Sequence, residues 1–369
     1  MVFLLIRTLS VGGAERQVVQ LANMLGRRDI LVGIVTLYDN GPLGQAIDHH
    51  RIRHFGLGKR GRWDLLGPVL RLFRLLRREK PAILYAFLPA QTALAALLHP
   101  FLPPCRLVFG LRSSLDYRRT DWLQRAVYRL ETWLAPRAAL IIANSEAGRA
   151  AALRRGMKPE RLVVIGNLID TDYFLPDPIA RARQRAAWGV ADTESLIGMA
   201  ARFDPMKGHD IFLTAAARLL RDRPSVRFVL IGSGAASYAG ALKSAAEDLG
   251  LGPSLIWAGD ACDMAAAYNA LDLATLSSLE GEGFPNAVAE AMACGVPVVA
   301  TDTGDTARLI GATGLTVPPG DPVGLADGWA MLLAADRAAL GSAARQRILT
   351  EFDSGEALDH NLRVLTSLA

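Results

Sequence analysis

The sequence predicts an α/β protein built from two doubly wound, Rossmann-like domains that face each other across a cleft. The chain has 369 residues, and at roughly 100 to 200 residues per domain this length accommodates two hydrophobic cores. Short apolar runs alternate with longer amphipathic stretches, which is typical of strand–helix units around a parallel sheet. A fresh series of such runs begins in the second half, after a segment rich in Asp and Pro.

Six apolar runs in each half have the length expected for buried parallel strands. Those of the first half are residues 2–6, 31–36, 83–87, 107–109, 140–143 and 162–165. Those of the second half are residues 196–201, 227–231, 255–258, 271–276, 296–300 and 315–317. Residues 167–178 lie between the two series and have the Asp and Pro content of a linker. We therefore predict one domain over 1–168, a second over 169–347, and a C-terminal helix over 348–369. In a two-domain chain such a helix can pack back on the first domain, but the sequence alone does not decide this.

Residues that mark helix starts and ends are clearest in the second half. Asp321 and Pro322 supply an N-cap and a first-turn proline before an Ala/Leu-rich segment. Pro285 precedes a helix predicted over 286–294, which Gly295 closes.

Composition excludes several classes of protein. A hydrophobic fraction of 51% and a charged fraction of 21% exclude disorder and collagen. Cys105, Cys262 and Cys294 are far apart and form no CxxC pair, so neither a disulfide framework nor a zinc cluster is predicted, which fits a reducing cytoplasm. The apolar run at the N-terminus stops at Arg7, too short for a signal peptide, and no run approaches the roughly 18 residues of a membrane span.

The net charge of +5 divides unevenly along the chain. Residues 1–175 hold 26 Lys and Arg against 13 Asp and Glu, whereas residues 176–369 hold 15 against 23. The first half therefore carries a charge of +13 and the second half a charge of −8. This split predicts that the two halves bind different partners or bind each other.

Two cations follow the first predicted strand of the second half. Arg202 and Lys207 lie five residues apart on a loop that enters a helix near residue 209. In open parallel sheets, ligands bind beyond the carboxyl ends of the strands. An arginine fork, a lysine charge and a helix N-terminus suit a diphosphate. Two solvated surface cations are the alternative, and spacing alone does not decide between them.

Glycines and carboxylates follow other strands of this half. Gly232 and Gly234 come after the run 227–231, where missing β-carbons let backbone approach a ligand, although a glycine pair after a strand is more often just a tight turn. Glu280, Glu282 and Glu290 surround a predicted helix start. Carboxylates accept hydrogen bonds from sugar hydroxyls, and helix N-termini bind phosphate. Together these groups predict a ligand that is part polyol and part phosphate, such as a nucleotide sugar.

These motifs resemble those of the large retaining glycosyltransferase family four, of GT-B fold, over nearly the whole chain. Residues 12–16, Gly-Gly-Ala-Glu-Arg, look like the family's N-terminal glycine loop. Arg202 with Lys207-Gly208 matches its R…KG element, and residues 230–234 match its glycine turn. Glu282 to Glu290, followed by Ala-Met-Ala-Cys-Gly, matches its E-x7-E signature. The branch most similar makes bacterial surface polysaccharides and lipid-linked glycans.

The resemblance implies a role for each of these residues. Arg202 and Lys207 would neutralise the donor's diphosphate as it leaves, Glu290 would hold the ribose hydroxyls, and Glu282 the hydroxyls of the transferred sugar. Further donor contacts are implied for Gly12, Gly13, Gly232, Gly234, Gly259, Gly283, Phe284, Pro285 and Asn286. No metal or other cofactor is expected, because the two cations and the helix end would neutralise the diphosphate in place of a metal ion.

One position departs from the family pattern. Many relatives have a histidine in a TxH-like motif after a strand of the first domain, where this chain has Arg112. Arginine cannot act as a general base. The leaving phosphate is then the expected base, and Arg112 is a candidate for binding the acceptor or a phosphate, with a domain-surface cation as the alternative.

A basic segment, 59–80, predicts a partner for the first domain. It holds eight cations against Asp64 and Glu79, and its pattern predicts an amphipathic helix that begins after Asp64 and ends before Pro81. A basic amphipathic helix beside Trp63 favours contact with an anionic membrane surface, although every such helix also needs an apolar side for its own core. No nucleic-acid-binding module is recognisable. We expect a cytoplasmic enzyme, peripheral at the inner face of the membrane.

Two other functions stay open from the sequence. One is a nucleotide-sugar epimerase of the same fold, which would need dedicated acid and base side chains. The other is a non-catalytic sensor or scaffold that binds sugar nucleotides, an alternative that the missing histidine keeps open.

Overall fold

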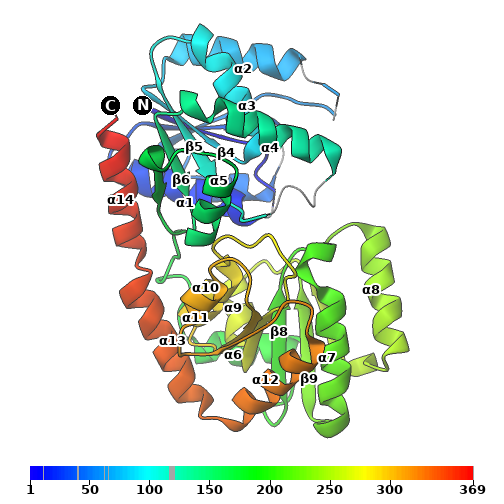
Figure 1. Cartoon of the computed structure of the whole chain (residues 1–369). Coiled ribbons are helices and arrows are strands. Elements are labelled where there is room, and N and C mark those ends of the chain that lie inside the picture. Colours follow the sequence, from blue (N-terminus) through cyan, green and yellow to red (C-terminus); the bar gives the residue numbers. More distant parts are fainter. Residues whose placement is uncertain (11, 40, 62, 65, 116–120, 369) are drawn as a thin grey trace. The chain divides into compact units, whose positions relative to one another are not determined.

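The computed structural model describes residues 1–10, 12–39, 41–61, 63–64, 66–115 and 121–368. The chain forms two compact units (Figure 1). Unit 1 comprises Met1–Leu168 and Gly355–Ala369, and unit 2 comprises Ile169–Ser354. Both are α/β units with fully parallel sheets, as the sequence predicted.

Unit 1 contains a seven-stranded sheet of order β3-β2-β1-β4-β5-β6-β7. Its strands are β1 (Val2–Ile6), β2 (Val32–Thr36), β3 (Ile52–Gly56), β4 (Ile83–Phe87), β5 (Arg106–Leu111), β6 (Leu140–Ala143) and β7 (Leu162–Val164). Six of them match the predicted runs, whereas β3 was missed. The β3 sequence Ile-Arg-His-Phe-Gly has one fully buried residue, because the strand forms the edge of the sheet.

Helices cover both faces of this sheet. They are α1 (Gly13–Arg27), α2 (Leu66–Glu79), α3 (Pro89–Leu98), α4 (Trp122–Leu134), α5 (Glu146–Arg154) and α14 (Ser354–Thr366). Alternation along β1 separates two cores, since Phe3 and Leu5 pack with α2 to α5, and Leu4 and Ile6 pack with α1 and α14.

Unit 2 contains a six-stranded sheet of order β10-β9-β8-β11-β12-β13. Its strands are β8 (Ser195–Ala200), β9 (Val226–Ile231), β10 (Leu255–Gly259), β11 (Leu273–Leu276), β12 (Val298–Thr301) and β13 (Leu315–Val317). Its helices are α6 (Pro178–Ala187), α7 (His209–Asp222), α8 (Ala236–Asp248), α9 (Met264–Asn269), α10 (Asn286–Ala293), α11 (Thr306–Ile310), α12 (Pro322–Ala334) and α13 (Arg337–Glu351). One core holds α7, α8 and α12 against the sheet, and the other holds α9, α10, α11 and α13.

The boundary between unit 2 and the C-terminal helix of unit 1 lies later in the chain than the sequence predicted. The predicted tail began at 348, but Ala344 and Ile348 of α13 are buried in the core of unit 2. Residues from Gly355 onward belong to unit 1, where Leu358 and Leu365 pack in the same core as Leu4.

The expected helix caps are present. The Asp321 carboxylate accepts a hydrogen bond from the Gly324 amide at the start of α12. Pro285 is the N-cap residue of α10, and Gly295 follows that helix with a φ of +74°. These caps fix the residues at which α10 and α12 begin and at which α10 ends.

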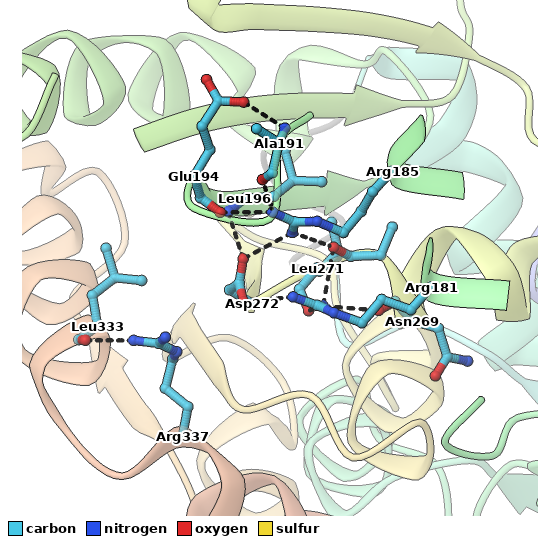
Figure 2. Close-up of polar contacts among 11 residues, drawn as sticks. Arg181, Arg185, Ala191, Glu194, Leu196, Asn269, Leu271, Asp272, Leu333 and Arg337 are labelled. Atoms are coloured by element: carbon cyan, nitrogen blue, oxygen red, sulfur yellow. Dashed lines mark hydrogen bonds and ion pairs between the residues drawn. The ribbon is translucent and has the colours of Figure 1, made fainter. Parts of the chain in front are cut away.

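A buried ion network fastens α6 to the amino ends of β8 and β11 (Figure 2). Arg185 is buried and donates to one carboxylate oxygen of Asp272 at 3.1 Å, while Arg181 donates to the other at 2.9 Å. The same Asp272 accepts the Leu196 amide at 2.8 Å. This network lies at the edge of the sheet opposite the strand ends that position the candidate site.

Candidate functional site

The candidate site lies at the carboxyl edge of the unit 2 sheet. In the sheet, β8 lies beside β11. From β8 the chain adds β9 and β10 on one side, and it then crosses over to add β11, β12 and β13 on the other side. Such a switch point is where open parallel sheets bind ligands. The loops that follow β8 and β11 carry Lys207 and Glu282, respectively.

The backbone around Lys207 is tightly held. Gly208 adopts a left-handed conformation with φ of +63°, and a β-carbon there would approach the carbonyl oxygen of Ser277 to 2.2 Å. The Ser277 hydroxyl lies 3.0 Å from the carbonyl of Lys207 and 2.8 Å from that of Gly208. Only glycine fits at position 208, so the lysine enters the site from a fixed main chain.

Lys207 and Glu282 form an ion pair across the two loops. The ammonium of Lys207 donates to Oε1 of Glu282 at 2.5 Å, and the Ser278 hydroxyl donates to the same oxygen at 2.6 Å. Glu282 is buried and Lys207 is partly buried. A cation and a carboxylate predicted from motifs 75 residues apart therefore meet at one point.

Arg202 is placed differently from Lys207. Its guanidinium pairs with the Asp204 carboxylate at 2.9 Å, and its side chain is 63% exposed. The pair lies within one loop, so Arg202 presents positive charge at the surface of unit 2 on the same loop as Lys207.

The glycine turn after β9 packs against protein backbone. A β-carbon at Gly232 would lie 2.2 Å from the Ala201 carbonyl oxygen, and one at Gly234 would lie 2.3 Å from that of Phe203. At both positions the missing β-carbon is therefore required by a close contact within the protein itself. The glycines let the Arg202 loop lie directly on the turn, where Phe203 N–H donates to the Ser233 carbonyl at 2.8 Å.

Gly259 extends this arrangement to β10. It has φ of +66°, and its carbonyl accepts the Gly232 amide at 2.7 Å. Ser233 donates to the Asp260 carboxylate at 2.7 Å. The loops after β8, β9 and β10 thus form one connected rim, which includes the predicted donor-contact residues Gly232, Gly234 and Gly259.

The segment before α10 contributes backbone rather than side chains. Phe284 is buried in the core against Phe352, with ring centroids 5.9 Å apart. The Gly283 carbonyl accepts the Asp305 amide at 3.0 Å. Pro285 has no N–H, so amide donors for a phosphate in this segment come from Gly283, Phe284 and Asn286, the first residue of α10.

Glu290 is held by a residue that the sequence did not reveal. It lies in α10, is almost fully buried, and accepts a hydrogen bond from the Tyr268 hydroxyl at 3.0 Å. Tyr268 belongs to α9 and is itself buried. A lone tyrosine in an Ala-rich helix gave no signal in the sequence.

His209 is a second residue without a sequence signal. It begins α7, has no exposed surface, and its ring makes an edge contact with Phe203 at 4.9 Å. Among the described residues, neither ring nitrogen has a hydrogen-bond partner of good geometry. Burial lowers the pKa of His209 to about 4, against smaller opposing effects of the Asp204 backbone and the Asp210 carboxylate. The ring is therefore neutral beneath the loop that carries Arg202 and Lys207.

Three predicted residues belong to unit 1. Gly12 has extended backbone and precedes α1, of which Gly13 is the first residue. Arg112 follows β5, where it donates to Asn167 Oδ1 at 3.0 Å and to the Tyr85 hydroxyl at 3.2 Å. Its guanidinium also lies over the Phe87 ring, 4.8 Å from the centroid. Arg112 is thus held in one orientation at the carboxyl edge of its own sheet.

Two families of known proteins match the sequence. Residues 11–173 match Glycosyltransferase Family 4, and residues 194–335 match Glycosyl transferases group 1. The two matches cover most of unit 1 and most of unit 2.

Curated relatives match over parts of their length. A D-inositol 3-phosphate glycosyltransferase of Segniliparus rotundus is 34% identical over 178 residues, which are 47% of this chain and 37% of the relative. The putative glycosyltransferase EpsF of Bacillus subtilis is 28% identical over 79% of this chain and 76% of its own. The chain thus spans little more than a third of the first of these relatives.

A solved structure matches the whole chain. Anabaena HepE in complex with UDP-glucose superposes with a TM-score of 0.89 at 24% identity, covering 99% of each chain. This similarity establishes the two-domain GT-B fold.

Proposed function

Because the chain belongs to glycosyltransferase family four, we propose that it transfers a sugar from a nucleotide sugar to a glycan or a lipid-linked acceptor, with retention of anomeric configuration. The observation that carries the proposal is the contact between Lys207 and Glu282 at the switch point of the unit 2 sheet. Anabaena HepE, described in complex with UDP-glucose, supports a nucleotide-sugar donor.

The charged residues of unit 2 suit the leaving group. As the bond between the anomeric carbon and the diphosphate breaks, negative charge grows on the diphosphate. Lys207 and Arg202 stabilise this charge, with the amides at the start of α10 as further donors. Glu282 then accepts hydrogen bonds from the sugar hydroxyls, and Glu290 accepts them from the ribose.

The proton of the acceptor hydroxyl goes to the leaving phosphate in this proposal. The new bond forms on the face of the sugar from which the diphosphate departs, so configuration is retained. Arg112 cannot take the proton, because a guanidinium is always protonated. Its fixed orientation suits binding of a phosphate or the acceptor. The two cations supply the positive charge, so we propose that the transfer needs no metal.

The surface of α2 supports contact of unit 1 with an anionic membrane. Its core face contains Pro68, Leu72, Leu75 and Leu76. Trp63, Leu66 and Leu70 lie outside that face, with 83%, 80% and 50% of their surfaces exposed. Exposed apolar residues beside arginines favour peripheral binding to a lipid surface. Arg62 and Leu65 of the predicted segment lie outside the described residues. None of the helices in the described part of the chain has the length and apolar character needed to cross a bilayer.

Donor turnover tests the proposal. Purified protein is screened by thermal shift against nucleoside diphosphates and their sugars. The best nucleotide sugar is then followed for release of free nucleoside diphosphate, as its sugar passes to an added glycan or glycolipid acceptor or to water, with and without EDTA. Transfer predicts stabilisation and release that EDTA leaves unchanged. Binding without release would indicate a sensor, and a donor sugar recovered with inverted configuration at a ring carbon would indicate an epimerase.

A further inference from the structure

A groove of about 460 Å³ lies between the edge strand β3 and helix α2 in unit 1. Arg71, Arg74 and Arg78 line it from α2, at a spacing that places them on one face of the helix. His54 and Leu57 line the opposite side. No carboxylate side chain is among the lining residues, so the groove has the charge of an anion site.

The three arginines differ in how they are engaged. Arg71 donates to the carbonyls of Leu57 at 2.6 Å and Gly58 at 3.2 Å. Arg78 pairs with Glu79, whose carboxylate is shared with Arg53. Within the described part of the chain, Arg74 has neither a hydrogen-bond nor an ion-pair partner. Arg74 is therefore available to an external anion, with Arg71 held beside it.

A second pocket, of about 310 Å³, shares His54 with the groove. Tyr38, Asp39 and His49 line it near the carboxyl ends of β1 and β2. His54 donates to or accepts from the Thr36 hydroxyl at 3.0 Å, and burial lowers the pKa of His54. Hydroxyl, carboxylate and imidazole groups in one pocket suit the hydroxyls of a sugar.

The exposed apolar residues Leu66 and Leu70 lie at the end of the groove where α2 begins. The bonds from Arg71 to Leu57 and Gly58 place the first turns of α2 near the carboxyl end of β3. Leu66 and Leu70 precede Arg74 by eight and four residues, a spacing that places them on the same side of α2 as Arg74, and both are exposed. A polar pocket, an arginine groove and an apolar helix start are thus adjacent.

We propose that the groove binds the phosphate of a lipid-linked sugar, through Arg74 and Arg71, with the sugar toward the His54 pocket and the lipid along Leu66 and Leu70. Arginine binds phosphate through two parallel N–H groups, so this binding depends on where the arginine is held. Attraction of a lipid surface by net positive charge alone has no such requirement. This assignment rests on the proposed transfer to a lipid-linked acceptor and names the group by which unit 1 recognises it.

The test uses farnesyl phosphate, a short isoprenyl phosphate, with the full chain and isothermal titration below the micelle concentration. We expect the wild-type protein to bind farnesyl phosphate at least tenfold more tightly than farnesol or inorganic phosphate. Equal binding of inorganic phosphate would assign the groove to a soluble phosphate compound and overturn the lipid assignment. Equal binding of farnesol would overturn the phosphate site.

Arg74→Gln and Arg77→Gln form a matched pair. Both variants remove one charge from α2, but Arg77 is absent from the groove lining and lies over the Phe73 ring. We expect at least tenfold weaker farnesyl phosphate binding for Arg74→Gln and less than a twofold change for Arg77→Gln. Equal losses would mean that only the overall charge matters and would refute the groove.

Nucleotide binding by the same preparations separates the two proposals. A protein that binds and turns over a sugar nucleotide but ignores farnesyl phosphate lacks the groove site while retaining the proposed function. A protein that binds no nucleotide contradicts the proposed function itself, whatever the groove binds.

Discussion

The ammonium of Lys207 is already neutralised by Glu282 before any donor arrives. A diphosphate that enters the site therefore exchanges one anionic partner of the lysine for another, which limits how much the lysine adds to ground-state affinity. The charge on the diphosphate grows in the transition state, so the lysine contributes most there.

We expect Lys207→Ala to lower kcat by about 100-fold or more, with a smaller change in donor affinity. Steady-state kinetics combined with direct titration of the nucleoside diphosphate measure the two effects separately. Lys207→Arg keeps the charge and is expected to retain more activity. Equal losses of kcat and affinity in the alanine variant would contradict a transition-state role.

Glu290→Ala is expected to remove most donor binding while the fold is retained. The carboxylate is buried, and its Tyr268 partner would lose an acceptor. Tyr268→Phe leaves the carboxylate in place and is expected to weaken nucleoside diphosphate binding by about tenfold, the value of one hydrogen bond. Calorimetric titration measures both. Normal nucleotide binding by the alanine variant would show that Glu290 does not hold the ribose.

His209 makes the stability of unit 2 depend on pH. Its pKa is about 4 in the folded protein and about 6.5 when unfolded, so the unfolded state binds more protons between these values. The free energy of unfolding therefore falls as pH drops from about 6.5 to 4, by up to about 3 kcal/mol.

Urea unfolding between pH 4 and 8 measures this dependence. His209 is the only histidine between residues 169 and 354, so His209→Phe should flatten the curve for unit 2 in that range. A variant with the wild-type slope would assign the dependence to other groups.

Among the helices, α2 is the one that we expect to bind an anionic membrane surface. Each cation near an anionic surface contributes about 1 kcal/mol, so replacing Arg71, Arg74, Arg77 and Arg78 by Gln should weaken vesicle binding by roughly a thousandfold. Cosedimentation with anionic liposomes at low and high salt measures this loss. Unchanged sedimentation would rule out membrane contact through α2.

The docking of α6 depends on Arg185. Removal of its side chain takes one donor each from the carbonyls of Ala191, Glu194 and Ala270 and breaks one contact to Asp272. We expect Arg185→Ala to destabilise unit 2 by about 3 kcal/mol or more.

Arg183→Ala provides the matched control on the same helix. Arg183 is exposed and pairs with Asp263 at 3.4 Å, so its loss should cost less than about 1 kcal/mol. Urea unfolding measures both changes. Similar losses for the two variants would mean that the buried network adds no stability of its own.

The sequence predicted most strands because a parallel strand buried on both faces is a continuous apolar run, as in β1 and β9. It missed β3, whose edge position lets Arg53 and Gly56 face solvent. Motif spacing located Lys207, Glu282 and Glu290, but it could not reveal Tyr268 or His209. Those residues act through contacts between loops and helices, which have no local periodicity.

Unit 1 is completed by residues that follow all of unit 2 in the chain. Leu365 shares a core with Val2, which makes this one of the longest sequence separations the chain can contain. Ordering such distant segments is entropically slow. Unit 2 is a continuous stretch, and all of it is translated before the last helix of unit 1. The unit whose synthesis begins first is therefore the last for which every residue has been made.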